Sequence, residues 1–142
     1  MALAPDDPRR QLFGTVGFDK SLAGIELTEV DAGHAVAEIT VADPVQNWVG
    51  TLHGGAIATI VDDVGTVAIM SVDRDGRPGV TTDLNVSYFS AAPSGARVRA
   101  SGRVLKIGRT LAFVEVDLHL LDEAGQPGRH VAQGRMTKFM AT

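Results

Sequence analysis

A short glycine-containing segment, His53-Gly54-Gly55, directly precedes a long apolar stretch and is the first candidate for chemistry. The backbone N–H groups in the first turn of a helix lack intrahelical partners, and the helix dipole makes that end positive. The Gly54 N–H is therefore a natural donor to a carbonyl oxygen that develops negative charge during a reaction. Glycines here would also permit a tight junction between a loop and a helix, so the motif alone leaves both interpretations open.

Asp62 is the second candidate, because it is a carboxylate within an otherwise apolar helix predicted from Leu52 to Val72. A helix that is apolar on nearly all sides is expected to be buried, and a buried carboxylate is costly unless it is paired or hydrogen-bonded. The helical wheel places Asp62 beside small residues that leave room for a substrate, whereas Asp63 points toward two threonines. Asp62 is thus a candidate general base, and a structural role for either aspartate stays the alternative.

The spacing of these two candidates indicates a site shared between subunits. Gly54 and Asp62 are eight residues apart, which is about 12 Å along a helix axis. A general base and an oxyanion donor must both lie within about 3 Å of one reacting carbonyl region. Two antiparallel copies of the helix satisfy this requirement, with Gly54 of one chain facing Asp62 of the other in a homodimer.

Several common catalytic and cofactor sites are absent from the sequence. There is no cysteine, which excludes disulfides, thiol nucleophiles and cysteine-ligated metals. The glycine motifs that bind dinucleotides or phosphates and the nucleophile elbow of serine hydrolases are missing too. The histidines show no metal-ligand spacing: His34, His53, His119 and His130. We therefore expect neither a metal nor a cofactor.

Charge and hydropathy patterning narrow the partners and the location. The net charge of −4 argues against a nucleic-acid partner, which would require a basic surface. The N-terminus lacks the pattern of a signal peptide, and the apolar stretch from Leu52 to Val72 is interrupted by His53, Asp62 and Asp63. We expect a cytoplasmic protein that does not insert into membranes.

The 142 residues suit one domain over residues 1–142, in which residues 1–23 form a leader with a short helix capped by Asp6 or Asp7. Alternation at residues 25–30, 34–41, 97–107 and 110–121, the β-rich segment 80–90 and the final segment 130–140 predict six strands around the central helix. This order predicts an α+β fold with one antiparallel sheet wrapped around one buried helix. A sheet covered by a single helix needs further cover, which a second subunit would supply.

The residues around these candidates resemble the hotdog thioesterase superfamily, in particular its PaaI-type branch. The similarity extends from about Ile25 and rests on residues 47–62, Pro78-Gly79-Val80-Thr81-Thr82-Asp83-Leu84-Asn85-Val86-Ser87-Tyr88, residues 104–113 and residues 132–138. It implies the hotdog fold, an antiparallel sheet wrapped around one long central helix. It also implies homodimers that pair into a homotetramer.

The resemblance further implies that the chain is an acyl-CoA thioesterase, which hydrolyses acyl-CoA to a free acid and CoA. Asn47 and the Gly54 N–H of one subunit would bind the thioester carbonyl. Asp62 and Thr81 of the other subunit would activate and orient the attacking water, with Asp62 as general base or as nucleophile. His53 would help hold the thioester or the loop. Without the resemblance, Thr81 is interpreted as an ordinary strand residue and His53 as a packed or capping residue.

CoA is part of the substrate, and its phosphates imply cationic side chains near the entrance to the site. The candidates are Lys106, Arg109, Arg135 and Lys138. Two other functions stay open: a hotdog dehydratase or hydratase acting on acyl thioesters, and a non-catalytic acyl-CoA-binding protein. The carboxylate of Asp62 argues against a binder, which gains nothing from it. Fatty acyl and aromatic acyl groups are equally compatible with the sequence.

Overall fold

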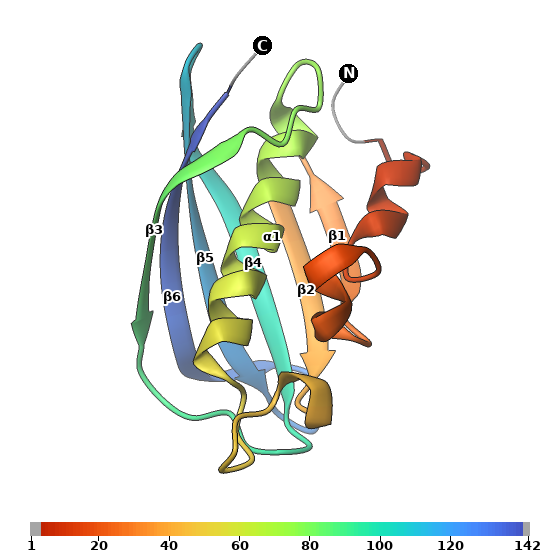
Figure 1. Ribbon diagram of the computed structural model, residues 1–142, viewed down its shortest axis with the longest axis vertical. Helices are drawn as coiled ribbons and strands as arrows, with labels where there is room; N and C mark the ends of the chain where they lie inside the picture. Colours follow the sequence, from red (N-terminus) through yellow and green to blue (C-terminus); the bar gives the residue numbers. More distant parts are fainter. Residues whose placement is uncertain (1–3, 141–142) are drawn as a thin grey trace.

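Six antiparallel strands wrap around one long helix in the computed structural model, which describes residues 4–140 (Figure 1). The helix α1 spans Gly54–Val72, and the strands are β1 (Glu26–Asp31), β2 (His34–Thr40), β3 (Val80–Tyr88), β4 (Arg97–Ile107), β5 (Leu111–Leu121) and β6 (Pro127–Phe139). The strands follow the order β1-β2-β4-β5-β6-β3 across the sheet. This arrangement is the α+β fold predicted from the sequence, although the helix begins at Gly54 rather than at Leu52.

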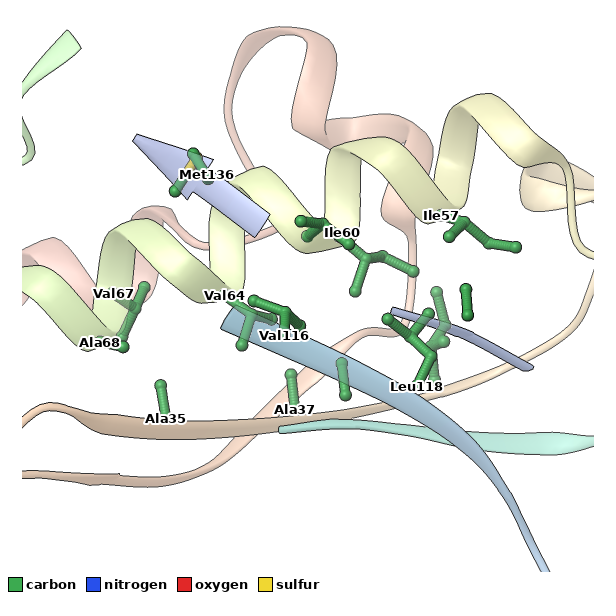
Figure 2. Packing of buried hydrophobic residues seen from close by; sticks show 14 of the residues in the cluster. Ala35, Ala37, Ile57, Ile60, Val64, Val67, Ala68, Val116, Leu118 and Met136 are labelled. Carbon is green, nitrogen blue, oxygen red and sulfur yellow. The ribbon is translucent and has the colours of Figure 1, made fainter. Parts of the chain in front are cut away.

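Close contact with the sheet fixes the position of α1, whose apolar side chains lie against β2 and β5, with Met136 of β6 beside the helix (Figure 2). A Cβ atom added at Gly134 of β6 would lie 2.5 Å from Val61 Cγ1. A Cβ atom added at Gly65 of α1 would lie 2.8 Å from the Met136 side chain. Interiors packed this densely transmit any displacement, so the helix and the polar residues along it are held rigidly.

The helix α1 is long and apolar enough, by length and composition alone, to cross a membrane. In the folded chain, 56% of this stretch is buried inside the protein. The apolar residues of α1 are therefore accounted for by packing in the core of the fold.

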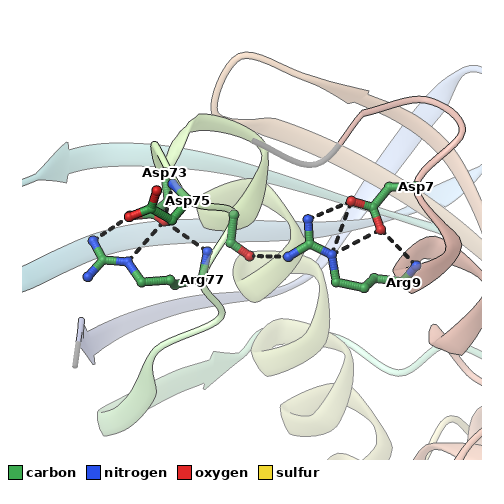
Figure 3. A network of polar contacts seen from close by, with 6 residues as sticks. Asp7, Arg9, Asp73, Asp75 and Arg77 are labelled. Carbon is green, nitrogen blue, oxygen red and sulfur yellow. Dashed lines mark hydrogen bonds and ion pairs between the residues drawn. The ribbon is translucent and has the colours of Figure 1, made fainter. Parts of the chain in front are cut away.

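The leader forms two short 3₁₀ helices, η1 (Pro8–Leu12) and η2 (Gly17–Leu22), which lie beside α1 (Figure 1). Asp7 caps η1 by accepting a hydrogen bond from the Arg9 N–H at 2.9 Å, one of the two caps predicted. The Arg9 guanidinium pairs with Asp7 and donates from Nη1 to the Gly76 carbonyl at 2.7 Å (Figure 3). Because Gly76 lies in the turn that follows α1, this contact ties the leader to the end of the helix.

A third short helix, η3 (Asp43–Val45), belongs to the segment between β2 and α1. The His53 N–H donates to the Val45 carbonyl at 2.8 Å, and the Leu52 N–H donates to the Ala92 carbonyl at 2.9 Å. These backbone hydrogen bonds fix the entry into α1, which is where the predicted oxyanion donor lies.

Candidate active site

The first turn of α1 has the free donor that the sequence predicts. His53 caps the helix, and its Nδ1 atom accepts a hydrogen bond from the Gly55 N–H at 2.8 Å. Among residues 4–140, no group accepts a hydrogen bond from the Gly54 N–H. The Gly54 carbonyl accepts one from the Tyr88 hydroxyl at 2.9 Å. The Gly54 N–H therefore lies unpaired at the positive end of the helix, where it can donate a hydrogen bond to an oxyanion.

Asn47 organises the loop before this turn. Its Oδ1 atom accepts hydrogen bonds from the Thr51 N–H at 3.0 Å and the Val49 N–H at 3.1 Å. Its Nδ2 atom donates to the Thr51 hydroxyl at 2.8 Å. A side-chain amide carries two N–H groups, so one remains for a ligand. Asn47 thus shapes the loop in its own chain and keeps one donor available.

Asp62 and Thr81 meet in the structure, although they are 19 positions apart in the chain. The Thr81 hydroxyl donates to Asp62 Oδ1 at 3.0 Å, and this brings β3 and α1 together at the candidate base. The Asp62 side chain is 40% exposed, so the burial expected from the apolar helical wheel is wrong for the single chain. The wheel could not show that the sheet ends at β3, which leaves this side of α1 uncovered.

Lys138 lies beside Asp62 and not at an exposed entrance, so its expected placement among surface cations is wrong. Its side chain is 7% exposed, and its Nζ atom lies 3.9 Å from Asp62 Oδ1. Burial lowers the pKa of Lys138, while the charges of Asp62 and Asp63 act in the opposite direction. The alternation along β6 could have predicted this burial, because Lys138 is on the same core-facing side of the strand as Ala132, Gly134 and Met136.

Asp63 is a polar group that the sequence singled out only weakly. Its Oδ2 atom is buried and has no hydrogen-bond partner among the described residues. Burial, the facing carboxyl of Asp19 in η2 and the charge of Asp62 together raise the pKa of Asp63 to about 8. Asp63 is consequently protonated at neutral pH. Asp19 lies 44 positions earlier, and no local pattern predicts such a pairing.

The other expected site residues are spread over the surface. Lys106 and Arg109 are exposed at and beside the turn between β4 and β5. Arg135 is also exposed, and it lies on the outer face of the sheet in a hollow with Asp83 and Asn85. Within residues 4–140, no group of three or more His, Asp or Glu side chains could hold a metal ion.

Comparison with known proteins places this arrangement in a class. The family model for the thioesterase superfamily matches residues 49–125, which is more than half of the chain, and the chain belongs to this family. The predicted hotdog fold and thioesterase class are thereby confirmed.

Individual relatives agree with this assignment. Acyl-coenzyme A thioesterase 13 from Homo sapiens is 41% identical over 123 residues, which covers 87% of this chain and 84% of that protein. The crystal structure of zebrafish thioesterase superfamily member 2 matches with a TM-score of 0.83 and 42% identity, covering 94% of this chain and 96% of that chain. A Streptococcus mutans protein bound to acetyl CoA matches with a TM-score of 0.72 and 25% identity, covering 83% and 89%.

Proposed function

We propose that this thioesterase hydrolyses acyl-CoA to a free acid and CoA, in sites that two subunits build together. The hydrogen bond from Thr81 to Asp62 at 3.0 Å carries the proposal, because it orients a partly exposed carboxylate as a base beside an uncovered helix face. The names of the relatives support the substrate class, since one is an acyl-coenzyme A thioesterase and another binds acetyl CoA.

In the proposed mechanism, Asp62 acts as the general base. One carboxylate oxygen accepts the Thr81 hydroxyl hydrogen, and the other takes a proton from the attacking water. The water oxygen then bonds to the thioester carbon, and the carbonyl oxygen becomes an oxyanion that the Gly54 N–H and Asn47 Nδ2 of the other subunit stabilise. The C–S bond breaks as this intermediate collapses. A thiol with a pKa of about 8.5 leaves readily, and the proton held by Asp62 returns to the sulfur.

A partner subunit is required because α1 is one continuous helix, in which Gly54 and Asp62 lie about 12 Å apart. The edge strand β3 offers a surface for that partner. Val80 is 61% exposed, Tyr88 is 53% exposed and Leu84 is 37% exposed. An open strand edge with apolar side chains is a template for strand pairing. We therefore propose an isologous homodimer formed across β3, with two such dimers in a homotetramer.

Lys106 and Arg109 are the proposed contacts to the CoA phosphates, because both are exposed, Lys106 near the end of β4 and Arg109 in the turn that follows. Reversing both charges should raise KM for CoA esters and leave short thioesters without CoA unaffected. Equal effects on both kinds of ester would contradict this role.

The test of the proposed function is thiol release from a panel of acyl-CoA esters by the wild type, Asp62→Asn and Asp75→Asn. Asp75 is an exposed aspartate just after the same helix and serves as the matched control. We expect release by the wild type and the control, and a loss of at least about a hundredfold in Asp62→Asn, in line with removal of a general base. Tight acyl-CoA binding without thiol release would instead establish a binding protein. Hydration of an enoyl-CoA without release would establish a hydratase.

A further inference from the structure

Lys138 is a buried cation that the proposed mechanism does not use. Its side chain is 7% exposed and lies on the core-facing side of β6, two positions after Met136. Lysine is rarely buried in proteins unless its ammonium group is paired, because removing the charge from water is costly. An apolar side chain at this position would extend the core without that cost. Packing alone therefore does not account for a lysine here.

The ammonium group of Lys138 lies next to the proposed base. Its Nζ atom is 3.9 Å from Asp62 Oδ1, and this oxygen also accepts the hydrogen bond from the Thr81 hydroxyl. Lys138 and Thr81 are paired residues of the neighbouring strands β6 and β3, so their side chains approach Asp62 from adjacent positions. Two groups of the sheet thus hold the same oxygen, and the proposed mechanism assigns the proton transfer to the other one.

Two carboxyl groups act on this one cation. Asp62 and Asp63 of α1 both attract the charge of Lys138, and Asp19 of η2 faces Asp63 from the leader. Burial and the neighbouring acidic groups raise the pKa of Asp63 to about 8, so Asp63 holds its proton at neutral pH. An ion pair of Asp62 and Lys138 beside a neutral Asp63 leaves no net charge among these three side chains. The arrangement favours a negative charge on Asp62, which the mechanism needs.

We propose that Lys138 is a positioning residue for the hydrolysis, whose ammonium group keeps Asp62 ionised and holds Oδ1 so that the other carboxylate oxygen faces the attacking water. The proposal rests on the proposed function, because it concerns the base of that reaction. Lys138 acts through Asp62 and does not itself contact the reacting atoms. This role differs from binding of a CoA phosphate, which would require the ammonium group at an exposed entrance.

The test compares the pH dependence of kcat/KM for thiol release in the wild type, Lys138→Met and Lys20→Met. Methionine is flexible, apolar and of similar length, so it suits a core-facing position. Asp62 is 40% exposed, so water can solvate the carboxylate that loses its partner, and the variant should fold. Lys20 is an exposed lysine of η2, and its replacement is the matched control.

Loss of the Lys138 charge should move the acid limb of the profile to higher pH. An opposite charge within about 4–6 Å favours the ionised form of a carboxyl group, and solvent screens this effect at a partly exposed site. We expect a shift of about one pH unit in Lys138→Met, which is about a tenfold loss of kcat/KM below both midpoints, with little loss on the plateau. Lys20→Met should keep the wild-type profile. An acid limb that stays in place in folded Lys138→Met would overturn the proposal, even if KM rises.

Chemical rescue separates the loss of charge from the loss of packing. Lys138→Ala removes the side chain beyond Cβ, and propylammonium from solution can occupy the vacated space beside Asp62. Propylammonium should return the acid limb toward its wild-type position. Propanol has a similar shape without the charge and should not do so. Equal effects of the two additives would show that Lys138 only fills space.

The protonation of Asp62 can also be followed without turnover, which separates this proposal from the proposed function. NMR of the Asp62 carboxyl carbon, with no substrate present, should show a titration midpoint about one pH unit higher in Lys138→Met than in the wild type. The same midpoint in both proteins would overturn the proposal, even in a chain that hydrolyses acyl-CoA. A shifted midpoint in a chain that releases no thiol would count against the proposed function alone.

Discussion

Replacing Gly54 with proline removes a single hydrogen atom from the proposed oxyanion site with little disturbance of the fold. Gly54 is the first residue of α1, where proline is well tolerated because its missing N–H has no intrahelical partner. The preceding residue, His53, has φ −63° and ψ 135°, which is the extended conformation favoured before proline. A Cβ atom at Gly54 would lie 3.5 Å from Tyr88 Cε1, an ordinary van der Waals contact.

The magnitude follows from the role of the donor. Loss of one oxyanion donor costs about 10²- to 10³-fold in kcat, or about 2.7–4 kcal/mol of barrier. The same substitution restricts the unfolded chain and should leave the free energy of unfolding unchanged or raised by up to about 1 kcal/mol. Gly54→Pro is therefore expected to separate activity from stability.

The assay is steady-state thiol release with Gly54→Pro and Gly54→Ala side by side, together with thermal unfolding of both. Gly54→Ala adds the Cβ atom and keeps the N–H, so its kcat should stay within a few-fold of the wild type. If the two variants release thiol at similar rates and both are folded, the Gly54 N–H does not stabilise the oxyanion.

Three further predictions concern the surroundings of the base. Thr81→Val removes the hydroxyl that donates to Asp62 and should lower kcat/KM by about 10- to 150-fold, the equivalent of about 1.5–3 kcal/mol for a charged hydrogen bond. Thr81→Ser keeps the hydroxyl and should retain activity. A fully active Thr81→Val would refute this role. The pKa of Asp63 is raised to about 8, so the folded chain holds a proton on this carboxyl that the unfolded chain releases above about pH 4. The free energy of unfolding of the wild type should therefore fall from pH 5 to pH 8, by less than about 1.4 kcal/mol per pH unit. In Asp63→Asn, denaturant titrations should show that this slope is lost, and an unchanged slope would assign it to other groups. Gly134→Ala places a methyl group 2.5 Å from Val61 and should destabilise the fold by about 1–3 kcal/mol through overpacking, whereas wild-type stability in chemical denaturation would show that the helix can shift.

The periodicity of apolar residues along the chain predicts most of the strands and the central helix. The alternation of residues 97–107 predicts β4 at the bounds that the structure shows, and the apolar stretch of residues 52–72 predicts α1 with a start two residues too early. The start of α1 was misplaced because Leu52 is buried, with 4% exposure, and therefore looks like part of the apolar stripe. His53 in fact ends the loop by capping the helix.

Long-range contacts account for what the sequence did not show. Thr81 was placed at the site only by family resemblance, because nothing in a β-branched strand residue announces its contact with Asp62. Lys138 is expected among the cations at the entrance, but its strand alternation directs it toward the core, where its side chain is 7% exposed. The facing pair of Asp19 and Asp63 depends on how the leader folds back onto α1, which no local pattern encodes.

Complementation between two inactive variants tests most directly the central claim that each site is built by two chains. Gly54→Pro and Asp62→Asn are co-expressed in equal amounts, and thiol release per chain is compared with that of the wild type. In a mixed dimer, one site contains the intact Gly54 N–H of one chain and the intact Asp62 of the other, while the second site carries both defects. Random pairing makes about half of the dimers mixed, and each mixed dimer has one intact site of two, so we expect about a quarter of wild-type activity. Activity no higher than that of either variant alone, with mixed dimers demonstrated, would show that Gly54 and Asp62 act within one chain and would contradict the shared site.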